Sequence, residues 1–206
     1  RFAWFAAACL IFSLAMASAG AAETNEPSPS LSAAELVREL RLGWNLGNSL
    51  DAMHKGHGFK LESETFWENP KPTKELINAV SAAGFSTIRI PISYYNHLRE
   101  DGTIDPAWLN RIEEVVGWAL ENGLYAIINI HHDPGMNPSL NWIFADTDEF
   151  EKSRVNFVSI WEQVAARFIE TDQRLIFQSS GEWMNRERSW DNREDQRIVH
   201  ALNQSF

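Results

Sequence analysis

Short runs of nearly continuous apolar residues recur along the chain, and each is followed by a polar segment and then by an amphipathic stretch. The runs occupy residues 42–46, 87–92, 125–130 and 175–177. Strands covered on both faces lack the alternation of half-exposed strands, so the pattern predicts buried parallel strands. The stretches between them predict helices over 73–83, 105–123 and 149–169, with a further helix in 192–206.

Several predicted helix ends have recognisable signals. Ser32 with Glu35 three residues later forms a capping box, which opens a helix that runs to about residue 40. Pro106 directly after Asp105 starts another helix, and Gly84 and Gly123 stop two of the helices. The chain therefore alternates strand and helix from about residue 32 onward.

The N-terminus differs from the rest of the chain. Arg1 precedes an apolar run over 2–17 that ends in the small residues of 17–21. This is the form of a secretory signal peptide, and the run is shorter than the roughly 20 residues that a membrane-spanning helix needs. We expect a signal peptide at 1–21, a linker at 22–31 and one domain at 32–206, exported to the medium or to the periplasm.

Composition narrows the choice of partners. The chain has 206 residues, 44% of them hydrophobic, and a formal net charge of −10. Negative charge disfavours nucleic acid and anionic membrane surfaces, so a neutral partner fits better. Its single cysteine, Cys9, lies in the signal peptide. We expect a monomer without a disulfide or a cofactor.

Four strand–helix units fit two architectures, a small doubly wound sheet or half of an eight-unit barrel. Periodicity does not decide between them. In both, the active residues lie at the carboxyl ends of the strands, because the loops that carry function meet there.

Polar and aromatic residues do gather after each predicted strand. The four segments are Gly43-Trp44-Asn45-Leu46-Gly47-Asn48, Arg89-Ile90-Pro91, His131-His132-Asp133 and Ser179-Ser180-Gly181-Glu182-Trp183. Taken alone, each has a structural explanation, such as a turn or a core ion pair. Together they describe a pocket with amides, a guanidinium, imidazoles and a carboxylate.

Tryptophans in the predicted loops suit a sugar ligand. Pyranose rings present hydroxyls around their edge and apolar faces above and below, so they bind to fixed polar groups and flat aromatic side chains. Of nine tryptophans, Trp108, Trp118 and Trp161 fall on helices and are expected in the core. The four in predicted loops are candidate stacking platforms: Trp67, Trp142, Trp183 and Trp190.

The segments GWNLGN, IRIPIS, INIHHD and LIFQSSGE, in this order and spacing, resemble the cellulase-type enzymes of glycoside hydrolase family 5. The resemblance runs from about residue 42 to residue 182. It implies a (β/α)8 TIM barrel, of which this chain holds the N-terminal four units. It also implies a glycosidase with two catalytic glutamates, most simply a retaining endo-β-1,4-glucanase acting on β-glucan.

The resemblance also assigns roles to residues. Glu182 becomes the proton donor and acid/base, while the nucleophile, at the end of the seventh strand, lies outside this chain. Arg89 supports that nucleophile and His131 belongs to the reaction subsite. Asn45 and His132 lie near the bound sugar, and we add Trp183 and Trp142 as substrate-binding residues.

One departure from the family pattern leaves alternatives open. The family usually has Asn before the acid/base glutamate, where its amide bonds the sugar 2-hydroxyl, whereas this chain has Gly181. A catalytically impaired, glycan-binding relative is therefore one alternative, and a mannanase or xyloglucanase on the same barrel is another.

A third alternative is a metal-dependent hydrolase that uses His131, His132 and Asp133. It is disfavoured because adjacent histidines on a strand point to opposite faces. We therefore expect no metal, and we expect the four-unit chain to be inactive when it is expressed alone.

Overall fold

The computed structural model describes residues 31–53, 61–133, 143, 148, 150–181, 183 and 193–206. Residues 31–206 form one compact unit. Among the described residues, no helix is both long enough and apolar enough to cross a membrane.

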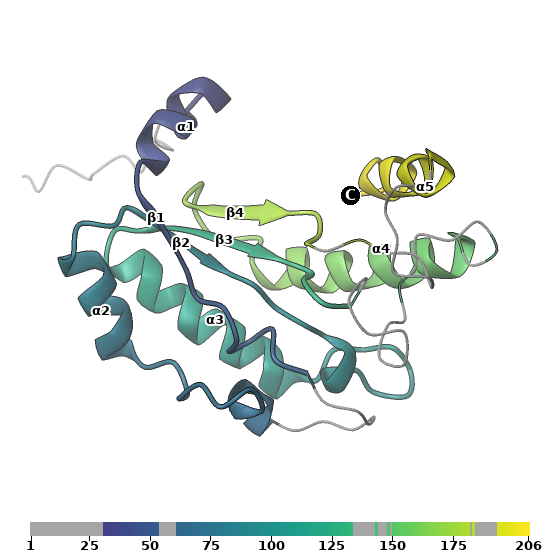
Figure 1. Ribbon diagram of the computed structural model, residues 1–206, viewed down its shortest axis with the longest axis horizontal. Helices are drawn as coiled ribbons and strands as arrows, with labels where there is room; N and C mark the ends of the chain where they lie inside the picture. Colours follow the sequence, from purple (N-terminus) through teal and green to yellow (C-terminus); the bar gives the residue numbers. More distant parts are fainter. Residues whose placement is uncertain are drawn as a thin grey trace, which may run out of the picture. The chain divides into compact units, whose positions relative to one another are not determined.

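Four parallel strands form one sheet, in the order in which they occur along the chain (Figure 1). The register pairs Asn45 with Arg89, Arg89 with Ile127 and Ile127 with Ile176. The strands are β1 (Gly43–Asn45), β2 (Thr87–Ile90), β3 (Tyr125–Asn129) and β4 (Leu175–Gln178).

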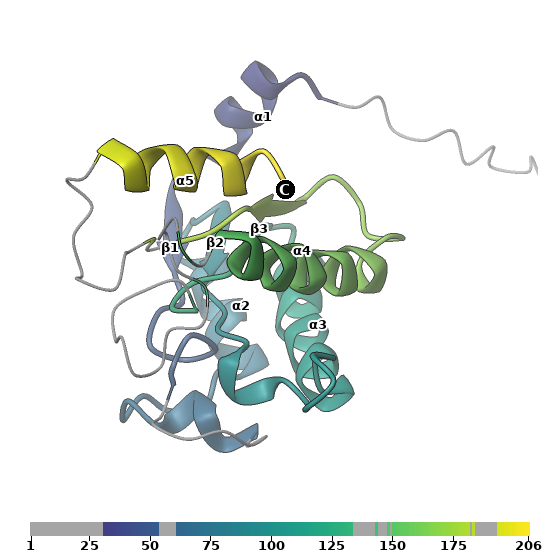
Figure 2. The ribbon, with the colours of Figure 1, turned by 90° about the vertical axis from the view of Figure 1, so that its right-hand side faces the viewer.

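Helices connect each strand to the next. The long helices are α1 (Ala33–Leu40), α2 (Lys74–Ala82), α3 (Pro106–Glu121), α4 (Phe150–Arg167) and α5 (Arg193–Asn203). Two short 3₁₀ helices, η1 (Leu61–Thr65) and η2 (Tyr95–His97), lie in the loops that follow β1 and β2. α2, α3 and α4 run along the same side of the sheet (Figures 1 and 2).

The sequential strand order resolves the choice that periodicity left open. Right-handed crossovers between neighbouring strands in sequence order place every connecting helix on one face of the sheet. A doubly wound sheet needs a reversal of strand order, which moves its later helices to the other face. The four described strands show no such reversal, so their order fits part of a barrel.

The helix signals act as predicted. Ser32 and Glu35 form a reciprocal capping box at α1, and Asp105 caps α3 ahead of Pro106. Gly84 and Gly123 follow α2 and α3 with φ of 91° and 74°, a conformation that side chains other than glycine rarely adopt. The last helix, α5, lies within the stretch predicted at 192–206 and ends at Asn203.

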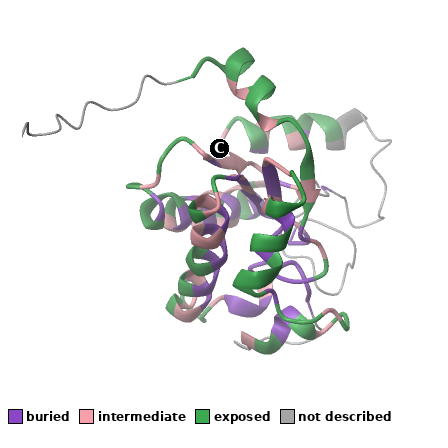
Figure 3. Ribbon diagram, turned by 90° about the vertical axis from the view of Figure 1, so that its left-hand side faces the viewer, coloured by how far each residue is buried: buried purple, intermediate pink, exposed green. Residues whose placement is uncertain are grey.

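The core lies between the sheet and the helices (Figure 3). Ile88 and Ile90 of β2 and Ala126 and Ile128 of β3 point toward the helices and are fully buried. The opposite face of the sheet is only half-buried at Arg89 and Ile127. The prediction that both faces are buried therefore fails at these two positions, and among the described residues no further strand covers the inner face.

Candidate active site

Near its carboxyl end, each of the four strands contributes one polar side chain to the inner face of the sheet. They are Asn45 from β1, Arg89 from β2, Asn129 from β3 and Gln178 from β4. Asn129 pairs in register with Gln178, as Asn45 does with Arg89. In a strand, residues two apart share a face, so Asn129 lies on the same face as Ile127, the partner of Arg89.

Arg89 connects three of these strands. Its Nη1 donates to Asn45 Oδ1 at 2.9 Å, and its Nε donates to Gln178 Oε1 at 2.9 Å. Gln178 Oε1 also accepts from Asn129 Nδ2 at 3.3 Å. Bonds from a guanidinium are among the stronger hydrogen bonds, and its planar fork fixes the direction of each. Arg89 therefore holds β1, β2 and β4 in one arrangement at their carboxyl ends.

Local chain geometry places Asn45 within reach of this fork. Gly47 leaves space for the Asn45 amide, since a Cβ at residue 47 would lie 2.9 Å from Asn45 Nδ2. Asn48 follows with φ of 58°, a turn conformation that asparagine tolerates better than most residues. The loop after β1 thus turns back over the end of its own strand.

His131 lies against this polar group. Its Nδ1 is 3.5 Å from Arg89 Nη2 and 3.3 Å from Asn129 Nδ2. The pKa of His131 is lowered to about 4, chiefly by burial and then by electrostatic interaction with His132 and Arg89, which Asp51 only partly opposes. The imidazole is therefore neutral at the pH at which most enzymes work.

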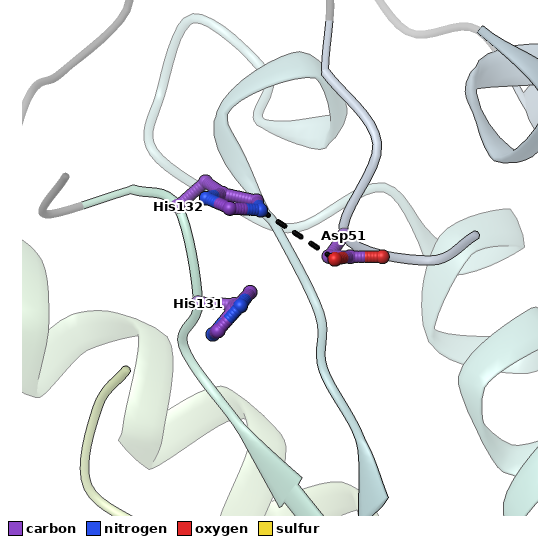
Figure 4. A group of neighbouring side chains, drawn as sticks. All are labelled: Asp51, His131 and His132. Carbon is purple, nitrogen blue, oxygen red and sulfur yellow. Dashed lines mark ion pairs between the residues drawn. The ribbon is translucent and has the colours of Figure 1, made fainter. Parts of the chain in front are cut away.

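His132 contacts a different partner, Asp51, in the loop after β1 (Figure 4). The distance from His132 Nε2 to Asp51 Oδ2 is 3.4 Å, and the backbone N–H of Ser49 donates to Asp51 Oδ1 at 2.8 Å. Burial acts to raise the pKa of Asp51, but hydrogen bonds from His132, Ser49 and Asn48 outweigh it and lower the pKa. Asp51 is therefore ionised and orients His132.

The two histidines are neighbours, which corrects the argument that they point to opposite faces. Their ring centroids are 4.4 Å apart, because both residues lie beyond the end of β3, where strand alternation no longer applies. With Asp51 they offer three possible ligand atoms within 4.8 Å of one another. However, Asp51 already bonds His132, and the guanidinium of Arg89 lies beside His131. These contacts explain the group without an ion.

Asp133 has a structural role. Its carboxylate accepts hydrogen bonds from the backbone N–H groups of Tyr94 and Tyr95 at 2.7–3.0 Å. It is fully buried and ties the end of β3 to the loop after β2.

The candidate aromatic platforms differ in their surroundings. Trp67 is 37% exposed and lies edge-on to His132, with 5.0 Å between ring centroids. Trp183 is only 8% exposed and packs against Phe157 of α4. Sugar stacking needs an open ring face, which Trp183 lacks in this arrangement, and its role in substrate binding stays a prediction. Trp108 and Trp161 are buried as predicted.

Several predicted site residues lie outside the described residues, namely Glu182, Trp142 and Trp190. Gly181 and Trp183, on either side of Glu182, are described. The backbone N–H of Gly181 donates to Ile130 O at 2.7 Å, which fixes residue 181 beside the end of β3.

Sequence reasoning missed two residues of the site, Asn129 and Asp51. Asn129 is a polar residue inside an apolar strand, and it is fully buried. That contrast was a usable signal. Asp51 gave no comparable signal, because its role depends on how the loop after β1 folds back toward His132.

Parallel strands in sequence order, helices on one side and polar side chains at the carboxyl ends define a (β/α)8 barrel, of which the chain forms the first four units. The sequence profile of Cellulase (glycosyl hydrolase family 5) matches residues 52–206. The chain therefore belongs to glycosyl hydrolase family 5.

Relatives and solved structures agree with this assignment. Endoglucanase A of Paenibacillus barcinonensis is 40% identical over 179 residues, covering 86% of this chain and 44% of the relative. Endoglucanase A of Ruminococcus albus is 39% identical over 182 residues, covering 85% and 48%. The crystal structure of a family 5 enzyme from Prevotella bryantii B14 superposes with a TM-score of 0.80 at 34% identity, covering 85% of this chain and 52% of that one. The chain thus spans about half the length of these proteins.

Proposed function

We propose that this chain is the N-terminal part of a secreted, retaining endo-β-1,4-glucanase, with Glu182 as its acid/base. Family membership and the endoglucanases among its relatives support this proposal. The observation that carries it is the polar group centred on Arg89. This group lies at the carboxyl ends of the four strands. Gly181, the residue directly before Glu182, is hydrogen-bonded to Ile130 at the same ends of the strands.

The proposed reaction divides the work between two carboxyl groups. A glutamate from beyond this chain attacks the anomeric carbon, while protonated Glu182 gives its proton to the leaving oxygen. Glu182 then removes a proton from water, which hydrolyses the glycosyl-enzyme intermediate. In retaining enzymes the two carboxyl groups are about 5–5.5 Å apart.

The described residues have distinct tasks in this scheme. The guanidinium of Arg89 keeps the nearby nucleophile ionised, since an opposite charge favours the charged form of a carboxylate. Asn45 and the neutral His131 offer hydrogen-bonding groups to sugar hydroxyls. Trp67, partly exposed beside His132, offers an apolar ring face to a neighbouring sugar.

A broader or shifted substrate range is the second candidate. One solved relative is a xyloglucanase from Paenibacillus pabuli, 39% identical with a TM-score of 0.76. Another is a lichenase from Caldicellulosiruptor sp. F32, 37% identical with a TM-score of 0.77. Solved relatives of similar identity thus include enzymes named for different glucans, so the substrate panel must include these glucans.

The test is reducing-sugar release by the complete protein from soluble β-1,4-glucan, mixed-linkage β-glucan, xyloglucan, mannan and xylan. Glu182→Gln should lower turnover by at least a hundredfold, because it removes the proton donor. Glu170→Gln is the matched control, since Glu170 is an exposed glutamate just beyond α4. A folded parent protein that cleaves none of these substrates would favour a glycan-binding role instead. Equal activity of the Glu182 variant and the control would refute the acid/base assignment.

We also propose that residues 1–21 direct export and are then removed. The support is the charged start, the apolar run and the small residues before position 22. N-terminal sequencing of the protein recovered outside the cytoplasm should begin at Ala22. A mature protein that retains residues 2–17 would contradict cleavage.

A further inference from the structure

Gly181 and His131 occupy the same small space. A Cβ built on Gly181 would lie 2.2 Å from His131 Nδ1 and 2.9 Å from His131 Cε1. Real Cβ atoms do not approach other atoms so closely, so any side chain at position 181 must displace the imidazole. The backbone of Gly181 does not have the positive φ that would by itself call for glycine. Space, and not backbone conformation, therefore requires glycine here.

Both segments that form this contact are held in place. Gly181 N–H donates to Ile130 O at 2.7 Å, which fixes the chain before Glu182 against the residue that precedes His131. The amide of Asn129 is oriented by the backbone N–H of Ile92, which donates to its Oδ1 at 3.3 Å. Its Nδ2 group therefore faces His131 as a donor. The contact belongs to a fixed framework, and a substituted side chain has little freedom to avoid the ring.

The partners of His131 determine its tautomer. Arg89 Nη2 and Asn129 Nδ2 are both donors, so Nδ1 of the imidazole must accept. The proton of the neutral ring is then on Nε2. Within the described part of the chain, no hydrogen bond from this Nε2–H is found. This N–H is left available as a donor.

We infer that Gly181 is a positioning residue that acts through His131: its missing side chain lets the imidazole lie against the backbone just before Glu182 and offer its Nε2–H to a sugar hydroxyl. The inference rests on the proposed function for the identity of the ligand. It also accounts for the departure at position 181, since an asparagine side chain there and the imidazole in its present place exclude each other.

The first experiment substitutes Gly181→Ala in the complete protein. We expect kcat on the best glucan to fall at least tenfold while the protein stays folded, since one methyl group pushes the ring away from Arg89 and Asn129. Gly117→Ala is the matched control, because a Cβ at this glycine of α3 meets nothing within 4 Å. The control should keep the parent kcat. Parent-like kcat in Gly181→Ala would overturn the inference.

The second experiment is a double-mutant cycle with His131→Ala. If Gly181 acts through the ring, Gly181→Ala should change kcat less than twofold once the imidazole is absent. An equal loss with and without His131 would mean that residue 181 acts by another route, and would overturn the inference.

A third readout does not depend on turnover. Histidine NMR should show the His131 midpoint near its pKa of about 4 in the parent, and closer to the ordinary value in Gly181→Ala, whose displaced ring is more exposed. The His131→Ala spectrum assigns the signal. An unchanged midpoint would refute the displacement of the ring. If the parent cleaves no glucan but the midpoint moves, the proposed function fails and the link between Gly181 and His131 stands.

Discussion

A buried ion pair between the loop after β1 and α3 offers a test of what stabilises this part of the fold. Glu64 of η1 is fully buried, and Arg111 of α3 is nearly so. Arg111 donates from Nε at 2.9 Å and from Nη2 at 2.8 Å to the carboxylate of Glu64. Its Nη2 also donates to Pro72 O at 2.8 Å. The pair therefore fastens the loop after β1 to the helix that packs on β3.

Arg111→Met should destabilise the complete protein by about 3 kcal/mol. Removing one partner of a buried pair costs about 3–5 kcal/mol, because the remaining charge has lost its compensation. Lys71, half-exposed with Nζ 3.4 Å from Glu64 Oε1, compensates in part, so we expect the lower end of this range. Such a loss is a large share of the roughly 5–15 kcal/mol that stabilises an ordinary domain.

Urea unfolding at neutral pH measures the effect, as a lower midpoint with an unchanged slope. Arg154→Met is the matched control, because Arg154 and Glu151 form an exposed pair on α4 at 3.0 Å. An exposed pair contributes about 0–1 kcal/mol. Replacing Glu64 and Arg111 together by methionine should recover most of the loss, since no uncompensated buried charge remains. Equal losses in Arg111→Met and Arg154→Met would refute this reasoning.

Three further predictions concern the site and the sheet. Arg89→Lys should lower kcat at least tenfold, as seen in steady-state kinetics, because an ammonium group cannot bond Asn45 and Gln178 with the geometry of the fork. The pKa of His131 is about 4 in the folded state, below its ordinary value of 6.5. Between pH 4 and pH 6.5 the unfolded state therefore binds more protons than the folded state. Stability should fall by about 1–3 kcal/mol as pH drops from 6.5 to 4, and unfolding curves of His131→Ala should depend less on pH in this window. Residues 31–206 expressed alone should aggregate in light scattering and release no sugar, because β1 and β4 have no outer neighbour among the described strands.

The sequence predicted the elements of this half barrel well, because their signals are local. Ser32 and Glu35, Asp105 and Pro106, and the glycines at 84 and 123 act on the backbone within one or two turns. The apolar runs likewise correspond to all four strands. Strand order is not a local property, and the sequential order that distinguishes this sheet from a doubly wound one came from the structure.

The candidate site divides in the same way. The sequence placed Asn45, Arg89 and His131 at the carboxyl ends of strands, because position along a strand can be read from the pattern. It did not find Asn129, whose amide joins His131 to Gln178 across strands. It also expected an open Trp183, which the structure buries against α4.

By itself, then, the sequence determined which residues end each strand and which family they resemble. Only the tertiary structure decided which side chains meet. Arg89 reaches Gln178 across 89 positions of sequence, and His132 reaches Asp51 only because both loops leave the same edge of the sheet. The close approach of the His131 imidazole to Gly181 is the clearest case of a contact that only the tertiary structure decided. The reason is physical: such contacts depend on register, loop path and free volume, which no local pattern contains.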